Sequence, residues 1–377
     1  MKGFGFGCMR PPKLSEGSTP VPEFDNVDLE QMKQMVDEFI GQGFTYFDTA
    51  WMYSNFKNEQ MLKATLTDRW PRDAYLLADK MSSSYFRKAE DVDRVFREQL
   101  GRCGVEYFDY YLLHDIGTDD YDKFTECGCF EWIREKKAEG TARYIGFSTH
   151  DDPEFIDRIL TEHPEMEFVQ IQLNYLDWEN AGVRARECCE MIAKHGRPIV
   201  VMEPCKGGTL TNLPDDVAEI LHRYAPDQSQ ASWAIRFAAS QRNVRMVLSG
   251  VSSLEQLRDN LSFMREFQPL TEEETALVLQ AVDKINSTIA IPCTSCAYCV
   301  PGCPAGIPIP KYFSLYNVNL KDINREDWTP QEDFYYRLTL SSASPKKCVE
   351  CGQCEKICPQ HLPVIRYLKE VAEHFGG

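Results

Sequence analysis

Eight cysteines near the C-terminal end of the chain form two runs with one spacing. Each run has two residues between its first three cysteines, three residues before the fourth, and a proline directly after it. The runs are Cys293, Cys296, Cys299 and Cys303, then Cys348, Cys351, Cys354 and Cys358. Three thiolates at this spacing can surround one face of a four-iron cluster, and the fourth points toward a neighbouring cluster. The spacing therefore predicts two [4Fe-4S] clusters.

The fourth cysteine of each run is expected to cross over to the other cluster. One ligand set would then be Cys293, Cys296, Cys299 and Cys358, and the other Cys348, Cys351, Cys354 and Cys303. The alternative is structural zinc, which usually takes two separated Cys-x-x-Cys pairs per ion. Four consecutive ligands followed by proline, found twice, favour clusters. The remaining cysteines lack ligand spacing as a group and most are expected to be core thiols.

Charge and composition limit the partners of this chain. The formal net charge of -17 over 377 residues argues against nucleic acid and anionic membrane, which would repel it. A small molecule or a basic electron carrier fits better. No signal peptide and no run of 18 apolar residues is visible. Fifteen cysteines without a secretion signal favour a reducing compartment, so we expect an oxygen-sensitive, cytoplasmic protein.

The first three quarters of the chain alternate short β-branched or aromatic runs with amphipathic segments, as parallel βα units do. The candidate strands are residues 4–8, 44–48, 75–80, 110–114, 144–148, 169–173, 199–203 and 246–249. Eight such strands predict a (β/α)8 TIM barrel, with a doubly wound open sheet as the alternative. A dinucleotide G-x-G-x-x-G fingerprint is absent. Gly3, Gly5 and Gly7 are instead expected to allow close packing of the first strand.

The barrel is expected to span residues 1–285, and a smaller domain residues 286–377. The 44 residues from Pro304 to Lys347 between the cysteine runs are too many for a compact bacterial ferredoxin. The second domain instead resembles the mostly helical, ferredoxin-like two-cluster modules that are fused to redox enzymes.

Four polar residues stand at the ends of candidate strands, where a barrel carries its chemistry. They are Asp48 and Tyr53 after the second strand, Lys80 at the third and His114 at the fourth. With their surrounding motifs, these positions resemble the aldo/keto reductase family in order and spacing, over roughly residues 1–265. The resemblance implies an Asp-Tyr-Lys-His catalytic tetrad, a small carbonyl or alcohol substrate, and NAD(H) or NADP(H) as cofactor.

The tetrad chemistry can be argued from the residues alone. Hydride transfer to a carbonyl develops negative charge on oxygen, so the site needs a proton donor. Tyr53 would be that donor, and the Lys80 ammonium, held by Asp48, is expected to lower its pKa from about 10. His114 would orient and polarise the carbonyl.

The resemblance also implies cofactor contacts. These are Ser148, Thr149, Gln172, Met202, Ser249, Gly250, Gln256 and Asn260. Thr149 replaces the usual Asn, and Met202 stands where an aromatic ring commonly stacks on the nicotinamide. Gly250 and Gln256 stand where the family has the Lys and Arg that clasp a 2'-phosphate. Although Arg258 can substitute in part, strong NADPH selectivity is not expected.

Electron counting leaves alternatives open. A hydride carries two electrons, whereas each cluster accepts one, so a direct connection needs a converter such as a flavin. One alternative is a flavin-dependent or ferredoxin-dependent reductase that does not use nicotinamide. Another is a non-catalytic iron-sulfur electron-transfer protein. The leading interpretation is an oxidoreductase of the aldo/keto reductase type, coupled through its clusters to a ferredoxin or other carrier.

Overall fold

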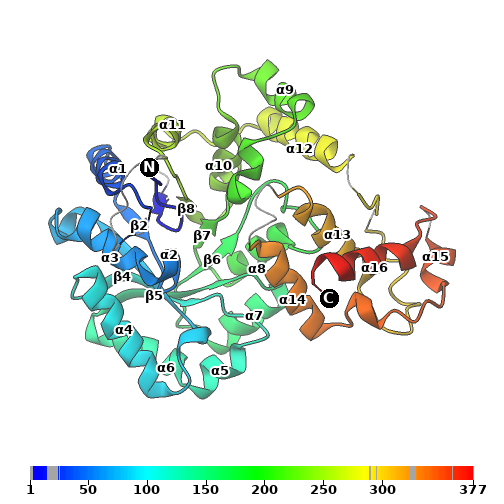
Figure 1. Ribbon diagram of the computed structural model, residues 1–377, viewed down its shortest axis with the longest axis horizontal. Coiled ribbons are helices and arrows are strands. Elements are labelled where there is room, and N and C mark those ends of the chain that lie inside the picture. The colour runs from blue at the N-terminus through cyan, green and yellow to red at the C-terminus, as the bar shows by residue number, and fades with distance from the viewer. Residues whose placement is uncertain are drawn as a thin grey trace.

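The computed structural model describes residues 3–14, 24, 26–287, 290–293, 295–322, 328–358 and 360–376. Eight parallel strands, each hydrogen-bonded to the next in the sequence, close into a barrel, with β8 paired to β1. Helices surround the barrel and a further helical region lies on one side of it (Figure 1). The predicted TIM barrel followed by a helical domain is thus confirmed, and the open sheet is excluded.

All eight predicted strands exist, and their ends differ from the prediction by at most two residues. The strands are β1 (Gly3–Gly7), β2 (Tyr46–Asp48), β3 (Leu76–Ser82), β4 (Phe108–His114), β5 (Ala142–Thr149), β6 (Phe168–Gln172), β7 (Ile199–Met202) and β8 (Val244–Ser249). The close packing expected of the first glycines is present. A Cβ added at Gly3 would lie 2.2 Å from the carbonyl oxygen of Arg245, so only glycine fits there.

Except for the four-residue helix Tyr53–Phe56, each helix around the barrel has buried side chains. The helices are α1 (Leu29–Gly41), α2 (Tyr53–Phe56), α3 (Asn58–Leu62), α4 (Ala89–Cys103), α5 (Tyr121–Glu126), α6 (Cys129–Glu139), α7 (Pro153–Glu162), α8 (Ala185–Lys194), α9 (Asp215–Tyr224), α10 (Gln230–Ser240), α11 (Leu254–Met264) and α12 (Glu272–Asn286). In α1, Met32, Val36 and Phe39 are fully buried at helical spacing. The Asp28 side chain starts that helix by accepting a hydrogen bond from the backbone of Gln31.

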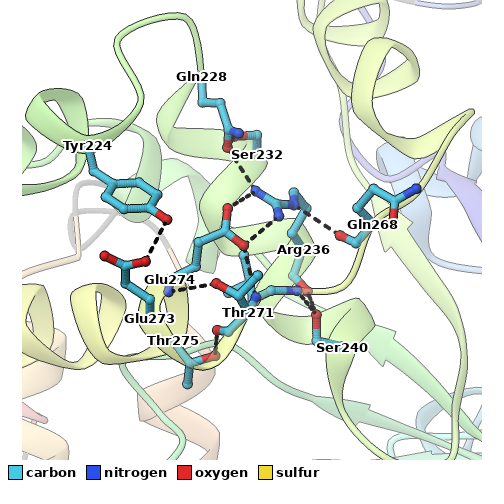
Figure 2. A network of polar contacts seen from close by, with 11 residues as sticks. Tyr224, Gln228, Ser232, Arg236, Ser240, Gln268, Thr271, Glu273, Glu274 and Thr275 are labelled. Carbon is cyan, nitrogen blue, oxygen red and sulfur yellow. Dashed lines mark hydrogen bonds and ion pairs between the residues drawn. The ribbon is translucent and has the colours of Figure 1, made fainter.

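A polar network fixes α10 against α12 (Figure 2). Arg236 of α10 makes two hydrogen bonds of 3.0 and 2.9 Å to the carboxylate of Glu274, and both side chains are buried. Thr271 and Glu274 also form a capping box at the start of α12. Because Arg236 and Glu274 both have hydrogen-bond partners, their buried ion pair holds α10 and α12 in one arrangement.

The C-terminal region has its own apolar core. Its helices are α13 (Ile309–Asn319), α14 (Pro330–Ser341), α15 (Gln353–Ile357) and α16 (Val364–His374). Tyr312, Phe313 and Leu368 are fully buried in this core, which also takes in Val183 and Ala185 at the start of α8. The two parts of the molecule therefore share an apolar contact. No helix among the described residues is long and apolar enough to cross a membrane.

Candidate active site and iron-sulfur sites

Lys80 and Asp48 form a buried ion pair at the carboxyl end of the barrel. The parallel register of β2 and β3 places Asp48 opposite Ala78, two residues before Lys80. The Lys80 side chain is fully buried, and its Nζ donates to Asp48 Oδ1 and to the carbonyl oxygen of Thr49 at 2.8 Å. Burial alone would lower the pKa of Lys80, but the Asp48 carboxylate reverses this and raises it. The ammonium therefore stays charged at neutral pH.

Tyr53 and His114 lie beside this pair. Lys80 Nζ is 5.0 Å from the centre of the Tyr53 ring, and that ring meets the His114 ring edge-on at 6.0 Å. Burial raises the pKa of Tyr53, and Lys80 offsets only part of the increase. The lowered Tyr53 pKa expected from the sequence is thus wrong, because sequence reasoning counted the ammonium and not the desolvation of the phenol. Tyr53 is fully protonated at neutral pH.

The backbone just after Tyr53 is unusual. Ser54, Asn55 and Phe56 all have φ between 50° and 66°, a region that residues other than glycine seldom adopt. Buried Asn58 supports this turn. Its Nδ2 donates to the carbonyl oxygen of Cys8 at 2.7 Å and to Ser54 Oγ at 3.1 Å. Asn58 thereby ties the Tyr53 turn to the end of β1, a role that the sequence did not reveal because Cys8 is 50 residues away.

Two neutral imidazoles face the same space. Burial and the nearby Lys80 charge hold the pKa of His114 well below its usual value. His150 was not predicted; it is also buried, and its pKa is lowered to about 4, chiefly by burial. The Nδ1 atoms of both rings are buried and have no hydrogen-bond partner among the described residues. Both imidazoles line the cleft at this end of the barrel, where a ligand would bind. His150 directly follows Thr149, the last residue of β5, so its place at a strand end is the sequence signal for it.

A cleft of about 1230 Å³ opens at this end of the barrel. Predicted site residues that line it are Asp48, Tyr53, His114, Ser148, Met202, Ser249, Gly250, Gln256 and Asn260. Lys80 lies behind the lining, and Thr149 and Gln172 are not part of it. Gln172 Nε2 instead donates to Asp177 Oδ2 at 2.6 Å, within a buried group that includes Lys206. Gln170, two residues earlier on β6, lines the cleft in its place.

The end of the cleft near α11 is poor in positive charge. Among the described lining residues, Arg10 is the one Lys or Arg, and its guanidinium donates to the carbonyl oxygen of Gly207 at 2.7 Å. Glu255 and Asp259 line the same end. The sequence suggested Arg258 as a partial substitute for the residues that bind a 2'-phosphate. Its guanidinium instead binds both carboxylate oxygens of Glu38, at 2.9 and 3.0 Å. These acids suit a ribose hydroxyl better than a 2'-phosphate.

The predicted first ligand set comes together in space. One cavity is lined by Cys293, Cys296, Cys299 and Cys358, with apolar side chains such as Ile309 and Phe313 between them. Four thiolates in an apolar cradle fit a [4Fe-4S] cluster. In the described part of the chain, no three His, Cys, Asp or Glu side chains converge closely enough for one metal ion. In a [4Fe-4S] cluster each thiolate binds a different iron, so four separate cysteines around one cavity suit it.

The second predicted set is Cys348, Cys351, Cys354 and Cys303. The two runs approach each other here: a Cβ on Gly302, beside Cys303, would lie 3.7 Å from Gln353 Oε1. Cys303 and Cys348 both pack against the C-terminal core. Pro304 is described, whereas Pro359, the proline of the second run, lies outside the described residues.

A closed barrel with a buried Asp-Lys pair under a tyrosine and a histidine, joined to an eight-cysteine module, defines an iron-sulfur oxidoreductase. The chain belongs to the aldo/keto reductase family, whose model matches residues 5–283. A 4Fe-4S dicluster domain matches residues 292–362. Both matches agree with the resemblance found in the sequence.

Individual relatives cover the barrel. The uncharacterized oxidoreductase YqkF of Bacillus subtilis is 26% identical over 273 residues, covering 64% of this chain and 84% of its own. The holo form of aldo-keto reductase AKR11C1 from Bacillus halodurans superposes with a TM-score of 0.59 and 26% identity, covering 74% of this chain and 91% of its own. A Klebsiella pneumoniae aldo-keto reductase in complex with NADPH has a TM-score of 0.59, 19% identity, and coverages of 74% and 90%; it shows the fold alone.

Proposed function

We propose that this protein reduces a small carbonyl compound, or oxidises the alcohol, with Asp48, Tyr53, Lys80 and His114 as its catalytic residues. The observation that carries this proposal is the Lys80–Asp48 ion pair buried directly beside Tyr53. A buried charged lysine is costly, and nothing in barrel packing requires one. It supplies a fixed positive charge where oxygen becomes negative during reduction.

Each catalytic residue has a distinct role in carbonyl reduction. Tyr53 donates the proton to the carbonyl oxygen, and Lys80 stabilises the phenolate that remains. Neutral His114 offers a ring nitrogen to the same oxygen and orients it. A bound nicotinamide supplies the hydride. The residues that would hold it are Ser148, Met202 and the segment from Ser249 to Asn260, with Gln170 in place of Gln172.

The cleft favours NADH. Since Glu255 and Asp259 line its α11 end and Arg258 is held by Glu38, a 2'-phosphate would meet negative charge there. Gly250 and Gln256 provide no cation. The neighbouring acids support the weak selectivity inferred from the sequence and extend it to a preference for the unphosphorylated cofactor.

The iron-sulfur domain is proposed to exchange electrons with the barrel site. Support comes from α14, which packs directly on the loop after His114. Arg337 of α14 binds Asp115 and Asp119 at 2.9 and 3.2 Å, and Phe334 meets the His150 ring at 5.5 Å. The clusters, when bound, exchange single electrons, so a flavin or a substrate reduced in two single steps would complete the connection.

Tyr53→Phe tests the catalytic proposal. The variant should bind NADH with unchanged affinity and lose turnover of a carbonyl substrate by a factor of about 100 or more, because only proton donation is removed. Binding is followed by quenching of tryptophan fluorescence, and turnover by NADH absorbance, with NADPH assayed in parallel. Tyr85→Phe, which alters a tyrosine outside the tetrad, serves as the control. An unchanged kcat in Tyr53→Phe would show that the tetrad is idle.

A further inference from the structure

The charge of this protein is divided unevenly between its two parts. Residues 286–377 contain nine Lys and Arg and nine Asp and Glu, so the formal charge of -17 belongs entirely to the preceding residues. The expectation of a basic electron carrier rested on the charge of the whole chain. A protein that docks at the C-terminal domain encounters a different local field, because solvent screens charges beyond about 8–10 Å.

Positive charge gathers around the second cysteine run. Lys346 and Lys347 directly precede Cys348, and Lys356 lies two residues from both Cys354 and Cys358. All three lysines are exposed. Among the described residues, no ion pair engages any of them. We call these three lysines, with the exposed Val349 and Ile357, the lysine patch.

The acids nearest to the patch are already engaged. Glu350 forms an ion pair with Lys369 at 2.7 Å. Glu355 Oε1 accepts a hydrogen bond of 3.0 Å from the backbone nitrogen of Ile365. Within residues 346–358, Glu355 is thus the one acid without an ion pair, beside three exposed lysines, so the charged side chains of this segment present net positive charge to solvent.

Apolar side chains stand between the lysines. Val349 is 65% exposed and Ile357 is 53% exposed, and each is adjacent to or near a cysteine of the run. Cys351, in the same loop, is also exposed. An apolar centre with a charged rim is the usual anatomy of a protein interface, and redox complexes are small interfaces of this kind. Figure 1 shows α15, which carries Lys356, at the edge of the molecule remote from the barrel strands.

We propose that the lysine patch is the docking surface for an acidic electron-carrier protein, such as a small ferredoxin. Electrostatic complementarity steers such a carrier to the lysine patch, while the acidic barrel repels it from other faces. The proposal rests on the electron-transfer role of the clusters given above, and it names the partner and the place of contact. It replaces the basic carrier expected from the whole-chain charge.

Equilibrium binding tests the proposal on the intact, cluster-loaded protein. The probe is an oxidised acidic ferredoxin, titrated calorimetrically at low and at moderate salt. The triple variant Lys346→Gln, Lys347→Gln, Lys356→Gln should weaken binding about tenfold or more at low salt, corresponding to about 1.4 kcal/mol. Its affinity should also depend less steeply on salt, since fewer charges take part.

A matched control removes the same charge from the barrel. Lys88→Gln, Lys194→Gln, Lys284→Gln changes three exposed barrel lysines and should leave the affinity within about twofold, because this variant leaves the patch intact. Iron content and visible absorbance verify that both variants keep their clusters. Equal weakening in the two triple variants would overturn the proposal, as would tighter binding of a basic c-type cytochrome than of the ferredoxin.

The patch has one competing explanation, which the same variants address. Four thiolates and the sulfides of a cluster carry negative charge, which nearby lysines can balance. If that is their only role, the patch variant will change the cluster reduction potential and leave ferredoxin affinity unchanged, and the docking proposal fails. Carbonyl turnover with NADH reports on the tetrad separately, so loss of docking and failure of the proposed reaction are distinguishable.

Discussion

The two buried histidines of the cleft make stability dependent on pH. The pKa of His150 falls from an ordinary value near 6.5 to about 4 on folding, and that of His114 is also lowered. Between these values the unfolded chain binds protons that the folded chain does not, so stability is full above about pH 6.5 and is lost as pH falls toward 4. His150 contributes a slope of up to about 1.4 kcal/mol per pH unit in that window, and His114 acts in the same direction.

His150→Gln should flatten this dependence. Urea unfolding at pH 7.0, 6.0 and 5.5 would measure it, with His222→Gln on the exposed face of α9 as the control. The His150 variant is expected to lose less stability on acidification than the unmodified protein. If all three proteins lose stability in parallel, His150 is not buried in its neutral form.

At the scale of elements, the contact between α14 and the loop after β4 joins the two parts of the molecule. The Arg337 side chain is only 7% exposed and forms ion pairs with two carboxylates, those of Asp115 and Asp119. Removing its charge leaves these acids close together without a counter-charge, and breaking such a buried arrangement is strongly destabilising. The same contact adjoins His114, so it also bears on the active site.

Arg337→Met should therefore lower the free energy of unfolding by about 3 kcal/mol. Arg366→Met is the matched control, because Arg366 pairs with Glu370 on the exposed face of α16, with the two side chains 63% and 42% exposed. The control should change stability by less than about 1 kcal/mol. Chemical denaturation of both variants gives the comparison. Equal effects would mean that the α14 contact is no stronger than a surface ion pair.

For the whole molecule, the crossed ligand sets make a prediction about metal content. Anaerobically purified protein should contain about eight irons and eight acid-labile sulfides. Cys293→Ala with Cys358→Ala removes two ligands of one cluster and should leave about four irons. Cys293→Ala with Cys303→Ala removes one ligand from each cluster and should leave far fewer than four irons. Iron and sulfide analysis decides the matter, and the reverse order would show that each run binds its own cluster.

Much of this protein is determined by local sequence patterns. The alternation of apolar runs and amphipathic segments predicted eight strands, because burial on both faces of a parallel sheet demands continuous apolar sequence. Cysteine spacing predicted the cluster ligands, since a cluster's geometry fixes how far apart its thiolates stand along a loop. Asp48, Tyr53, Lys80 and His114 were likewise found at strand ends, where barrel topology brings distant residues together.

The tertiary structure decided what depends on surroundings. Desolvation raises the pKa of Tyr53 above the value that its lysine neighbour suggests, and it makes His150 a second neutral imidazole in the cleft. Gln172 is drawn into a buried network while Gln170 lines the cleft. Burial and long-range pairing arise only when the chain has closed, because the free energy of a charge depends on the dielectric and partners around it.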